Sequence, residues 1–270
     1  MSILDAIILG IVEGITEFLP ISSTGHLIIA GHFLGVNNDF AKTFEIFIQL
    51  GAILSVIWLY RKKFVDVIKN ARIDRYSAQF IFNLVVAFIP AAVLGVIFHD
   101  AIKKYLFNPF TVSIALISIG LIIIWAENYV QRRRMRLIRD VDLIPGLKAL
   151  KIGIAQSFAL IPGVSRSGAT IIGGLLLGLD RKTATEFSFF LAVPTMLAAT
   201  LFDLLKSLSQ ISLNDLFILA VGFVTSFISA LIVIKAFLRF ISHSTFKPFA
   251  YYRILVGIIF IIMTFMGILK

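Results

Sequence analysis

Two short polar segments in this hydrophobic sequence hold most of the side chains that could carry out chemistry. In the first segment, Glu13 and Glu17 are four residues apart, so their carboxylates share one face of a helix. Like charges so close together repel in a low dielectric, and the pair needs a divalent cation, a shared proton or a water-filled cleft. We favour a divalent-cation site for Mg²⁺ or Ca²⁺ over the alternative that both acids simply face bulk water.

The same segment continues with three hydroxyls, a glycine and an imidazole, in the order Ser22, Ser23, Thr24, Gly25 and His26. At the start of a helix, such residues bind anions through free amides and the helix dipole. A serine with a histidine three residues later can also act as nucleophile and base, if the helix brings the side chains together. The simpler alternative is that the hydroxyls cap the helix and the imidazole is an interior histidine. For the cluster as a whole we favour function.

The second polar segment places Arg166 among the hydroxyls of Ser165, Ser167 and Thr170. An arginine inside an apolar region is costly unless it meets an anion, and its planar fork suits phosphate. A purely structural salt bridge to one of the two acids of the first segment is the alternative. Acids, hydroxyls, an imidazole and an arginine that converge within a bilayer fit phosphoryl chemistry on a lipid-borne phosphate.

The composition indicates that membrane helices position these residues. Of the 270 residues, 59% are hydrophobic and 15% charged, and the mean hydropathy is +0.98, which leaves too little polar surface for a water-soluble globule. The net charge of +10 comes from basic residues gathered in loops beside apolar stretches, a pattern typical of membrane orientation, so we expect no nucleic-acid partner. The lack of cysteine excludes disulfides and thiolate catalysis.

A transmembrane helix needs about 20 mostly apolar residues, and six segments come close to that length. We expect an all-α integral membrane protein with one membrane domain over residues 1–270 and transmembrane helices at Phe44–Tyr60, Phe80–Phe98, Phe110–Trp125, Phe187–Leu204, Leu216–Ile234 and Ile254–Leu269. The loops Arg61–Arg75 and Gln131–Lys151 are rich in Lys and Arg, which predicts a cytoplasmic position. The loops His99–Pro109 and Leu205–Asp215 hold few basic residues and fit the outer face.

The sequence also contains an internal repeat. A constant offset of 143 aligns Gly10–Phe47 with Gly153–Phe190 without a gap and gives 12 identities in 38 positions, with Ser23 and Arg166 at matching places. Each copy then holds one polar segment followed by three spans, an odd number, so the second copy enters the membrane from the opposite side. We therefore predict an inverted repeat, with copies at about 1–130 and about 148–270.

Neither polar segment can be an ordinary span, because each breaks after roughly half a bilayer at Pro20 or Pro162 and a run of small polar residues. We expect two re-entrant helix–loop–helix segments in addition to the six spans. Irregular backbone at membrane depth survives only where protein or a water-filled cavity satisfies it. The two breaks should therefore face the interior and meet near the middle of the bilayer.

The residues of both segments match two long motifs. The first is matched by Glu13, Glu17, Pro20, Ser22, Ser23, Thr24, Gly25 and His26, and the second by Pro162, Gly163, Ser165, Arg166, Ser167, Gly168 and Thr170. In these motifs, and over nearly its whole length, the chain resembles the undecaprenyl-pyrophosphate phosphatase family of bacteria, the bacitracin-resistance type. The resemblance implies hydrolysis of this polyprenyl pyrophosphate lipid to undecaprenyl phosphate and inorganic phosphate, which recycles the lipid carrier for peptidoglycan synthesis. It also implies a divalent-metal requirement and a bacterial cytoplasmic (inner) membrane location, with the active site opening to the periplasmic face.

Carried onto this chain, the resemblance implies a role for each motif residue. Glu13 and Glu17 would hold the metal, Ser23 or a water would attack the terminal phosphorus, His26 would be base or acid, and Arg166 would clamp the pyrophosphate. A further branch has His26 itself attacking. Supporting phosphate contacts would come from Ser22, Thr24, Ser165, Ser167 and Thr170. A homodimer is left open.

The rival interpretation is a transporter or flippase of lipid phosphate or another anion. Secondary transporters also use inverted repeats whose broken helices meet at the midplane. The set of acids, serine, histidine and arginine in one place favours an enzyme, because a carrier needs binding groups but not a nucleophile and a base.

Overall fold

In the computed structural model, every named element is a helix over the residues that it describes, which are 1–36, 39–133, 137–207 and 215–269. The elements are α1 (Ile3–Thr16), α2 (Ser23–Leu34), α3 (Asp39–Leu59), α4 (Arg61–Asn70), α5 (Arg75–Tyr105), α6 (Pro109–Arg132), η1 (Val141–Leu143), α7 (Gly146–Ser157), η2 (Phe158–Leu160), α8 (Arg166–Leu176), α9 (Arg181–Ser207), α10 (Leu216–Ile241) and α11 (Lys247–Phe265). The all-α class is therefore confirmed.

Local sequence signals fix several of these helix starts. α1 begins with a capping box, in which the Ser2 hydroxyl accepts from the Asp5 amide and the Asp5 carboxylate accepts from the Ser2 amide. α6 begins at Pro109, whose missing N–H costs nothing in the first turn, and the Asn108 side chain accepts from the Thr111 amide. These caps satisfy backbone donors that the helices leave unpaired.

Five helices, α5, α6, α9, α10 and α11, are long and apolar enough to cross a membrane. A sixth span exists only if α3 and α4 count as one, and that pair is bent by 69°. The outer faces carry exposed apolar side chains, such as Val96 at 71% and Ile232 at 64% of their surface. Apolar surface on this scale is stable in lipid and not in water. The chain is a multi-pass membrane protein with five or six spans.

Some predicted boundaries were wrong. The stretch Arg61–Arg75, expected as a loop, contains helix α4, because Phe64 and Val67 lie one turn apart and both pack against the core. The last helix was expected at Ile254–Leu269, but α11 starts at Lys247 and ends at Phe265, since hydropathy misses a first turn rich in polar and aromatic residues. Most of the predicted loop Leu205–Asp215 and part of the basic loop Gln131–Lys151 lie outside the described residues.

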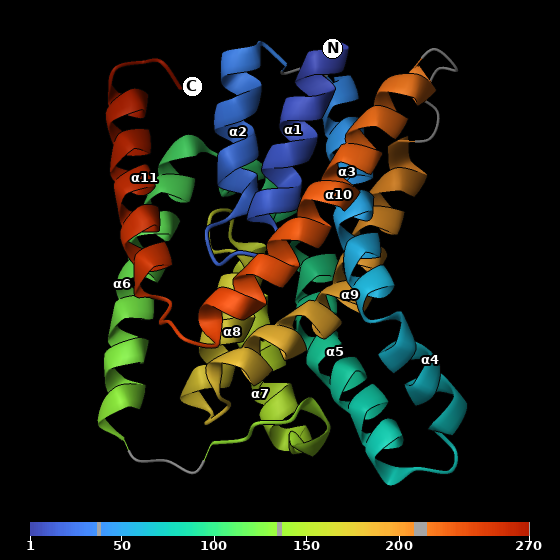
Figure 1. Ribbon diagram of the computed structural model, residues 1–270. Helices are drawn as coiled ribbons and strands as arrows, with labels where there is room; N and C mark the ends of the chain where they lie inside the picture. The colour runs from blue at the N-terminus through green and yellow to red at the C-terminus, as the bar shows by residue number, and fades with distance from the viewer. Residues whose placement is uncertain (37–38, 134–136, 208–214, 270) are drawn as a thin grey trace.

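The two broken segments enter the fold from opposite ends (Figure 1). The pair α1–α2 lies at the top of the view and α7–α8 below it, with the two breaks facing each other; α10 crosses in front and α6 and α11 form one side. α1 packs closely on α10 and α7 on α5, each through a glycine. A Cβ on Gly10 would lie 2.7 Å from the Gly222 carbonyl oxygen, and one on Gly153 would lie 2.3 Å from the Ala87 carbonyl oxygen. Only glycine allows these two crossings.

Candidate active site

The breaks between α1 and α2 and between α7 and α8 contact each other directly. The Ser167 hydroxyl donates to the Leu19 carbonyl at 2.8 Å. The Arg253 guanidinium of α11 donates to the carbonyls of Pro20, at 3.0 Å, and Gly163, at 2.7 Å. Carbonyls outside a helix need such partners when they are buried. The Arg253 side chain therefore links the two loops through hydrogen bonds.

Sequence reasoning missed Arg253, whose side chain is fully buried. It stands directly before the predicted last span and is easily interpreted as a residue at the membrane boundary. The available signal was Pro248, which favours a helix start and so places Arg253 inside the second turn of that helix. A buried arginine in a membrane helix indicates a function or a partner.

Both breaks end in a serine with the same uncommon backbone. Ser22 has φ 73° and Ser165 has φ 74°, and these two residues are related by the offset of 143. Each precedes a helix start, α2 and α8, and both helix starts line one cavity. The free amides and dipoles of two helix N-termini thus point at the same space, which favours an anion there.

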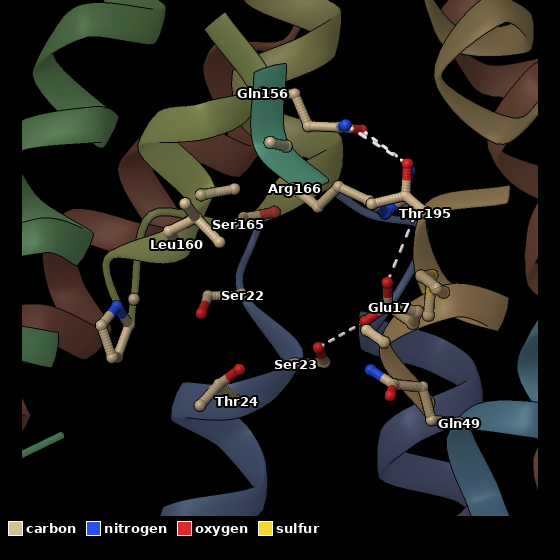
Figure 2. A pocket seen from close by; sticks show the side chains of 16 residues that line it. Glu17, Ser22, Ser23, Thr24, Gln49, Gln156, Leu160, Ser165, Arg166 and Thr195 are labelled. Atoms are coloured by element: carbon tan, nitrogen blue, oxygen red, sulfur yellow. Dashed lines mark hydrogen bonds and ion pairs between the residues drawn. The ribbon is translucent and has the colours of Figure 1, made fainter. Parts of the chain in front are cut away.

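The cavity has a volume of about 220 Å³ and is lined from both segments and from α3, α5 and α9. Six of the predicted site residues line it: Glu17, Ser22, Ser23, Thr24, Ser165 and Arg166. Three further polar residues join them: Gln49, Gln156 and Thr195. Figure 2 shows the amide of Gln156 pointing at Thr195, to whose hydroxyl it donates at 3.2 Å. The volume suits a diphosphate group and is below the roughly 300 Å³ of a typical ligand pocket.

Glu17 stands at the centre of the polar contacts in the cavity (Figure 2). One carboxylate oxygen accepts from the Ser23 hydroxyl at 2.6 Å, and the other accepts from Arg166 Nη2 at 3.3 Å. The ion pair weighed as a structural alternative is thus present. Arg166 also donates to the Ser188 carbonyl at 2.8 Å, while its buried Nε has no partner among the described residues. The arginine keeps a donor for a further anion.

The ring nitrogens of His26 contact groups other than the Ser23 hydroxyl, so this structure does not show the serine–histidine pair that would join nucleophile and base. The imidazole Nδ1 lies 2.7 Å from the Ser22 carbonyl oxygen, and Nε2 lies 2.8 Å from the Tyr252 hydroxyl of α11. The rings of His26 and Tyr252 also stack, at 5.6 Å between centroids. The turn of α2 carries His26 to the side that faces α11, and Ser23 to the side that faces Glu17.

Ser167 and Thr170, which were predicted to contact phosphate, make hydrogen bonds within the protein. Besides its bond to the other break, Ser167 lies 3.0 Å from the Ser165 hydroxyl. The Thr170 hydroxyl donates to the Ser188 hydroxyl at 2.7 Å, next to the carbonyl that holds Arg166. Among the described residues that line the cavity, neither Ser167 nor Thr170 is present. Their hydroxyls fix the backbone and the arginine.

Glu13 and Glu17 provide some of the ligands that a divalent-cation site needs. Glu13 is buried, and both of its carboxylate oxygens have no hydrogen-bond partner in the described part of the chain. An orphaned buried carboxylate one turn from Glu17 is a donor set for a cation. The described residues hold no group of three or more His, Cys, Asp or Glu side chains that could bind a metal. A cation held by these two acids would take its other ligands from water and substrate phosphate, as is usual for Mg²⁺.

Comparison with known proteins agrees with this geometry. The model of a family described as "Bacitracin resistance protein BacA" matches residues 6–259. A protein named undecaprenyl-diphosphatase from Neisseria gonorrhoeae is 51% identical over 265 residues, covering 98% of this chain and 96% of its own length. Proteins of the same name from Nitrosomonas europaea and Dechloromonas aromatica are 53% and 54% identical, covering 98% and 95% of this chain and 96% and 93% of theirs. The chain therefore belongs to the bacitracin resistance protein BacA family.

Proposed function

We propose that this protein is an undecaprenyl-diphosphatase that releases inorganic phosphate from undecaprenyl diphosphate and returns undecaprenyl phosphate for peptidoglycan synthesis. The observation that carries the proposal is the shared contact of Glu17 with Ser23 and Arg166, inside a cavity that receives two helix N-termini. A carboxylate, a hydroxyl and a guanidinium in one anion-binding cavity are the groups that phosphoryl transfer requires.

The first step places the diphosphate against the two helix starts, with Arg166 on its oxygens. The Ser23 hydroxyl gives its proton to Glu17, and its Oγ forms a bond to the terminal phosphorus. The anhydride P–O bond breaks on the far side, and undecaprenyl phosphate leaves with the electron pair. The hydrogen bond of 2.6 Å between Ser23 and Glu17 supports this proton transfer.

In the second step, the oxygen of a water bonds to the phosphorus as the Ser23 Oγ–P bond breaks. Glu17 returns its proton to Oγ, and inorganic phosphate leaves with the protons of that water. Arg166 is bound to both Glu17 and Ser188, so it can stabilise charge on the phosphoryl oxygens without moving far. A divalent cation held by Glu13, Glu17 and the substrate would neutralise charge on the diphosphate.

Two other nucleophiles are chemically competent. A water activated by an acid or imidazole would leave no covalent intermediate, and His26 would form a phosphohistidine. The ring nitrogens of His26 are engaged by the Ser22 carbonyl and by Tyr252, whereas the Ser23 hydroxyl contacts Glu17, which favours Ser23. We assign His26 and Tyr252 to holding the start of α2.

We infer the location and orientation in the membrane from the basic loops and from the internal repeat. We place the protein in the bacterial cytoplasmic (inner) membrane, with the basic loops inside and the active site open to the periplasmic face. The repeat copies at about 1–130 and 148–270 would then be inverted, with α1–α2 and α7–α8 as the re-entrant segments. A homodimer is compatible with this arrangement. The transporter alternative is less favoured, because the matched relatives carry the name of a phosphatase.

The deciding experiment measures phosphate release from undecaprenyl diphosphate by purified protein in detergent, followed by rapid acid quench to trap a phosphoenzyme. The serine mechanism predicts acid-stable phosphate on the peptide that contains Ser23, and loss of both labelling and turnover in Ser23→Ala. Recovery of an acid-labile adduct on His26 would instead identify the imidazole as nucleophile. Turnover by Ser23→Ala without any adduct would establish attack by water.

A further inference from the structure

A second hollow, lined by aliphatic and aromatic side chains, begins at the wall of the polar cavity. It has a volume of about 410 Å³ and lies between α5 and η2; its lining residues are Leu94, Phe98, Ala101, Ile102, Tyr105, Leu106 and Leu160. We call it the α5 groove. Leu160 of η2 lines the polar cavity as well. The two hollows therefore share one side chain.

The residues of α5 form a continuous path between the two hollows. Ala91 lines the polar cavity, and Leu94, Phe98, Ala101 and Tyr105 of the groove follow it at steps of three or four residues. Such steps keep side chains on one face of a helix. The path from Ala91 to Tyr105 covers about 21 Å at 1.5 Å per residue. It opens outward, since Tyr105 is 65% and Phe98 49% exposed.

The substrate has one charged end and a long hydrocarbon chain, and the two hollows match these parts. The polar cavity holds Glu17, Arg166 and hydroxyls, which suit the diphosphate, and the lining residue that it shares with the α5 groove is the aliphatic Leu160 (Figure 2). In that view, Leu160 lies across the cavity from Glu17. A chain that leaves along Leu160 enters the α5 groove and reaches the lipid-facing surface. The chain comes from lipid and not from water, so the groove binds it through van der Waals contacts with its aliphatic and aromatic side chains.

We propose that the isoprene units nearest the diphosphate bind in the α5 groove, with Leu160 at the junction of headgroup and chain. The proposal rests on the assignment of the diphosphate to the polar cavity. α5 approaches the junction closely, because a Cβ on Gly95 would lie 3.4 Å from a Leu160 methyl group. The position of Leu160 is thus set by α5 itself. The groove determines how the enzyme distinguishes long prenyl chains from short ones.

The first test fills the groove with Ala101→Trp and compares substrates of increasing chain length. For the C55 and C15 diphosphates, kcat/KM should fall about tenfold, because the indole occupies the space of the isoprene units and removes their contacts with the groove. For isopentenyl diphosphate, whose C5 chain ends near Leu160, it should stay within about twofold. The matched control is Val96→Trp, on the same helix but outside the groove, where Val96 is 71% exposed. That variant should resemble the parent with every substrate.

The second test labels the groove with a farnesyl diphosphate analogue that carries a photoreactive group on its last isoprene unit. Labelling should map to peptides of α5 and be displaced by undecaprenyl diphosphate, but not by an equal amount of undecaprenol. Labelling that no diphosphate displaces, or an Ala101→Trp profile equal to that of Val96→Trp, would mean that only bulk lipid occupies the groove. Turnover of the C5 substrate by Arg166→Ala would refute the headgroup site instead, so the two failures are distinct.

Discussion

The two broken segments share a backbone conformation at the start of their second helices, but the side chains at those starts differ in chemistry. Ser22 and Ser165 share a φ of 73–74°, and the helices that follow begin at matching positions, Ser23 and Arg166. At the offset of 143, the first segment thus bears a hydroxyl where the second bears a guanidinium. The fold supplies two equivalent helix starts around one cavity, and the side chains at those starts assign different tasks to them.

The same offset relates two further pairs of residues in the broken segments. Glu13 corresponds to Gln156, and Glu17 corresponds to Leu160, which lies at the entrance to the α5 groove. The first segment therefore carries the acids, whereas the second replaces them by an amide and an aliphatic side chain. One half of the site is suited to reaction and cation binding. The other half holds the phosphate and opens toward the prenyl chain.

The largest expected effect comes from removing the guanidinium that distinguishes the second segment. Arg166→Ala should lower kcat/KM for phosphate release by about 10³-fold, because no other cationic side chain is among the described residues that line the cavity. Arg166→Lys should recover only part of the loss, since an ammonium lacks the fork that reaches both Glu17 and Ser188. The exposed Arg239→Ala, in α10, is the control and should retain full activity. A tenth or more of the parent activity in Arg166→Ala would contradict the assigned task.

The next effect tests the acids of the first segment. Glu13→Gln gives the first segment the residue type of the second, and it should lower turnover about 100-fold and weaken the response to added Mg²⁺. Phosphate release measured over a range of Mg²⁺ concentrations, after treatment with a chelator, reports both changes. The exposed acid of the same helix provides the control: Asp5→Asn should titrate with Mg²⁺ like the parent. An unchanged Mg²⁺ titration in Glu13→Gln would remove Glu13 from the cation site.

A third prediction concerns the arginine that holds the two segments together. Arg253→Met keeps the volume but leaves the carbonyls of Pro20 and Gly163 unpaired, at about 1–3 kcal/mol each. Turnover should fall about tenfold, and the factor should be the same for the C5 and the C55 substrate, because both depend on the relative position of the helix starts. Measured kcat values for the two substrates separate this variant from those of the α5 groove, which depend on chain length. A loss confined to C55 would show that Arg253 does not position the headgroup site.

How far the sequence could predict this molecule differs between its parts. Hydropathy predicted a span within each of α5, α6, α9, α10 and α11, because a long apolar run has few alternatives in lipid. The motif residues on the cavity wall, such as Glu17, Ser23 and Arg166, could be predicted because charge and hydroxyl groups inside apolar sequence need a shared purpose. Helix α4 was missed, since its basic residues conceal the apolar face that packs on the core.

The contacts of α11 with the two broken segments could not be predicted. The partner of His26 is Tyr252, more than 200 residues away, and no local spacing indicates that α11 lies beside α2. The same holds for Arg253, whose carbonyl partners lie in both loops and in α6. Leu160 carried no chemical signal at all. Its importance arises only from its place between the polar cavity and the α5 groove.

The smallest expected effect tests the backbone that the two segments share. At φ near 74° a serine is strained, and glycine removes that strain at either position. The Ser165 hydroxyl accepts from the Gly168 amide at 3.1 Å, whereas Ser22 makes no side-chain cap within the described residues. The Ser165 hydroxyl also lies 3.0 Å from the Ser167 hydroxyl, so Ser22→Gly should be more stable than Ser165→Gly by about 1–2 kcal/mol, the value of one to two hydrogen bonds.

Thermal unfolding of both variants in the same detergent measures that difference directly. The comparison cancels the entropy that a new glycine adds to the unfolded chain, because each variant gains one. Ser165→Ala adds a control, since it keeps the strain and loses the cap, and it should be the least stable of the three. Equal unfolding temperatures for Ser22→Gly and Ser165→Gly would mean that the cap contributes nothing and that the two helix starts are equivalent in energy as well as in shape.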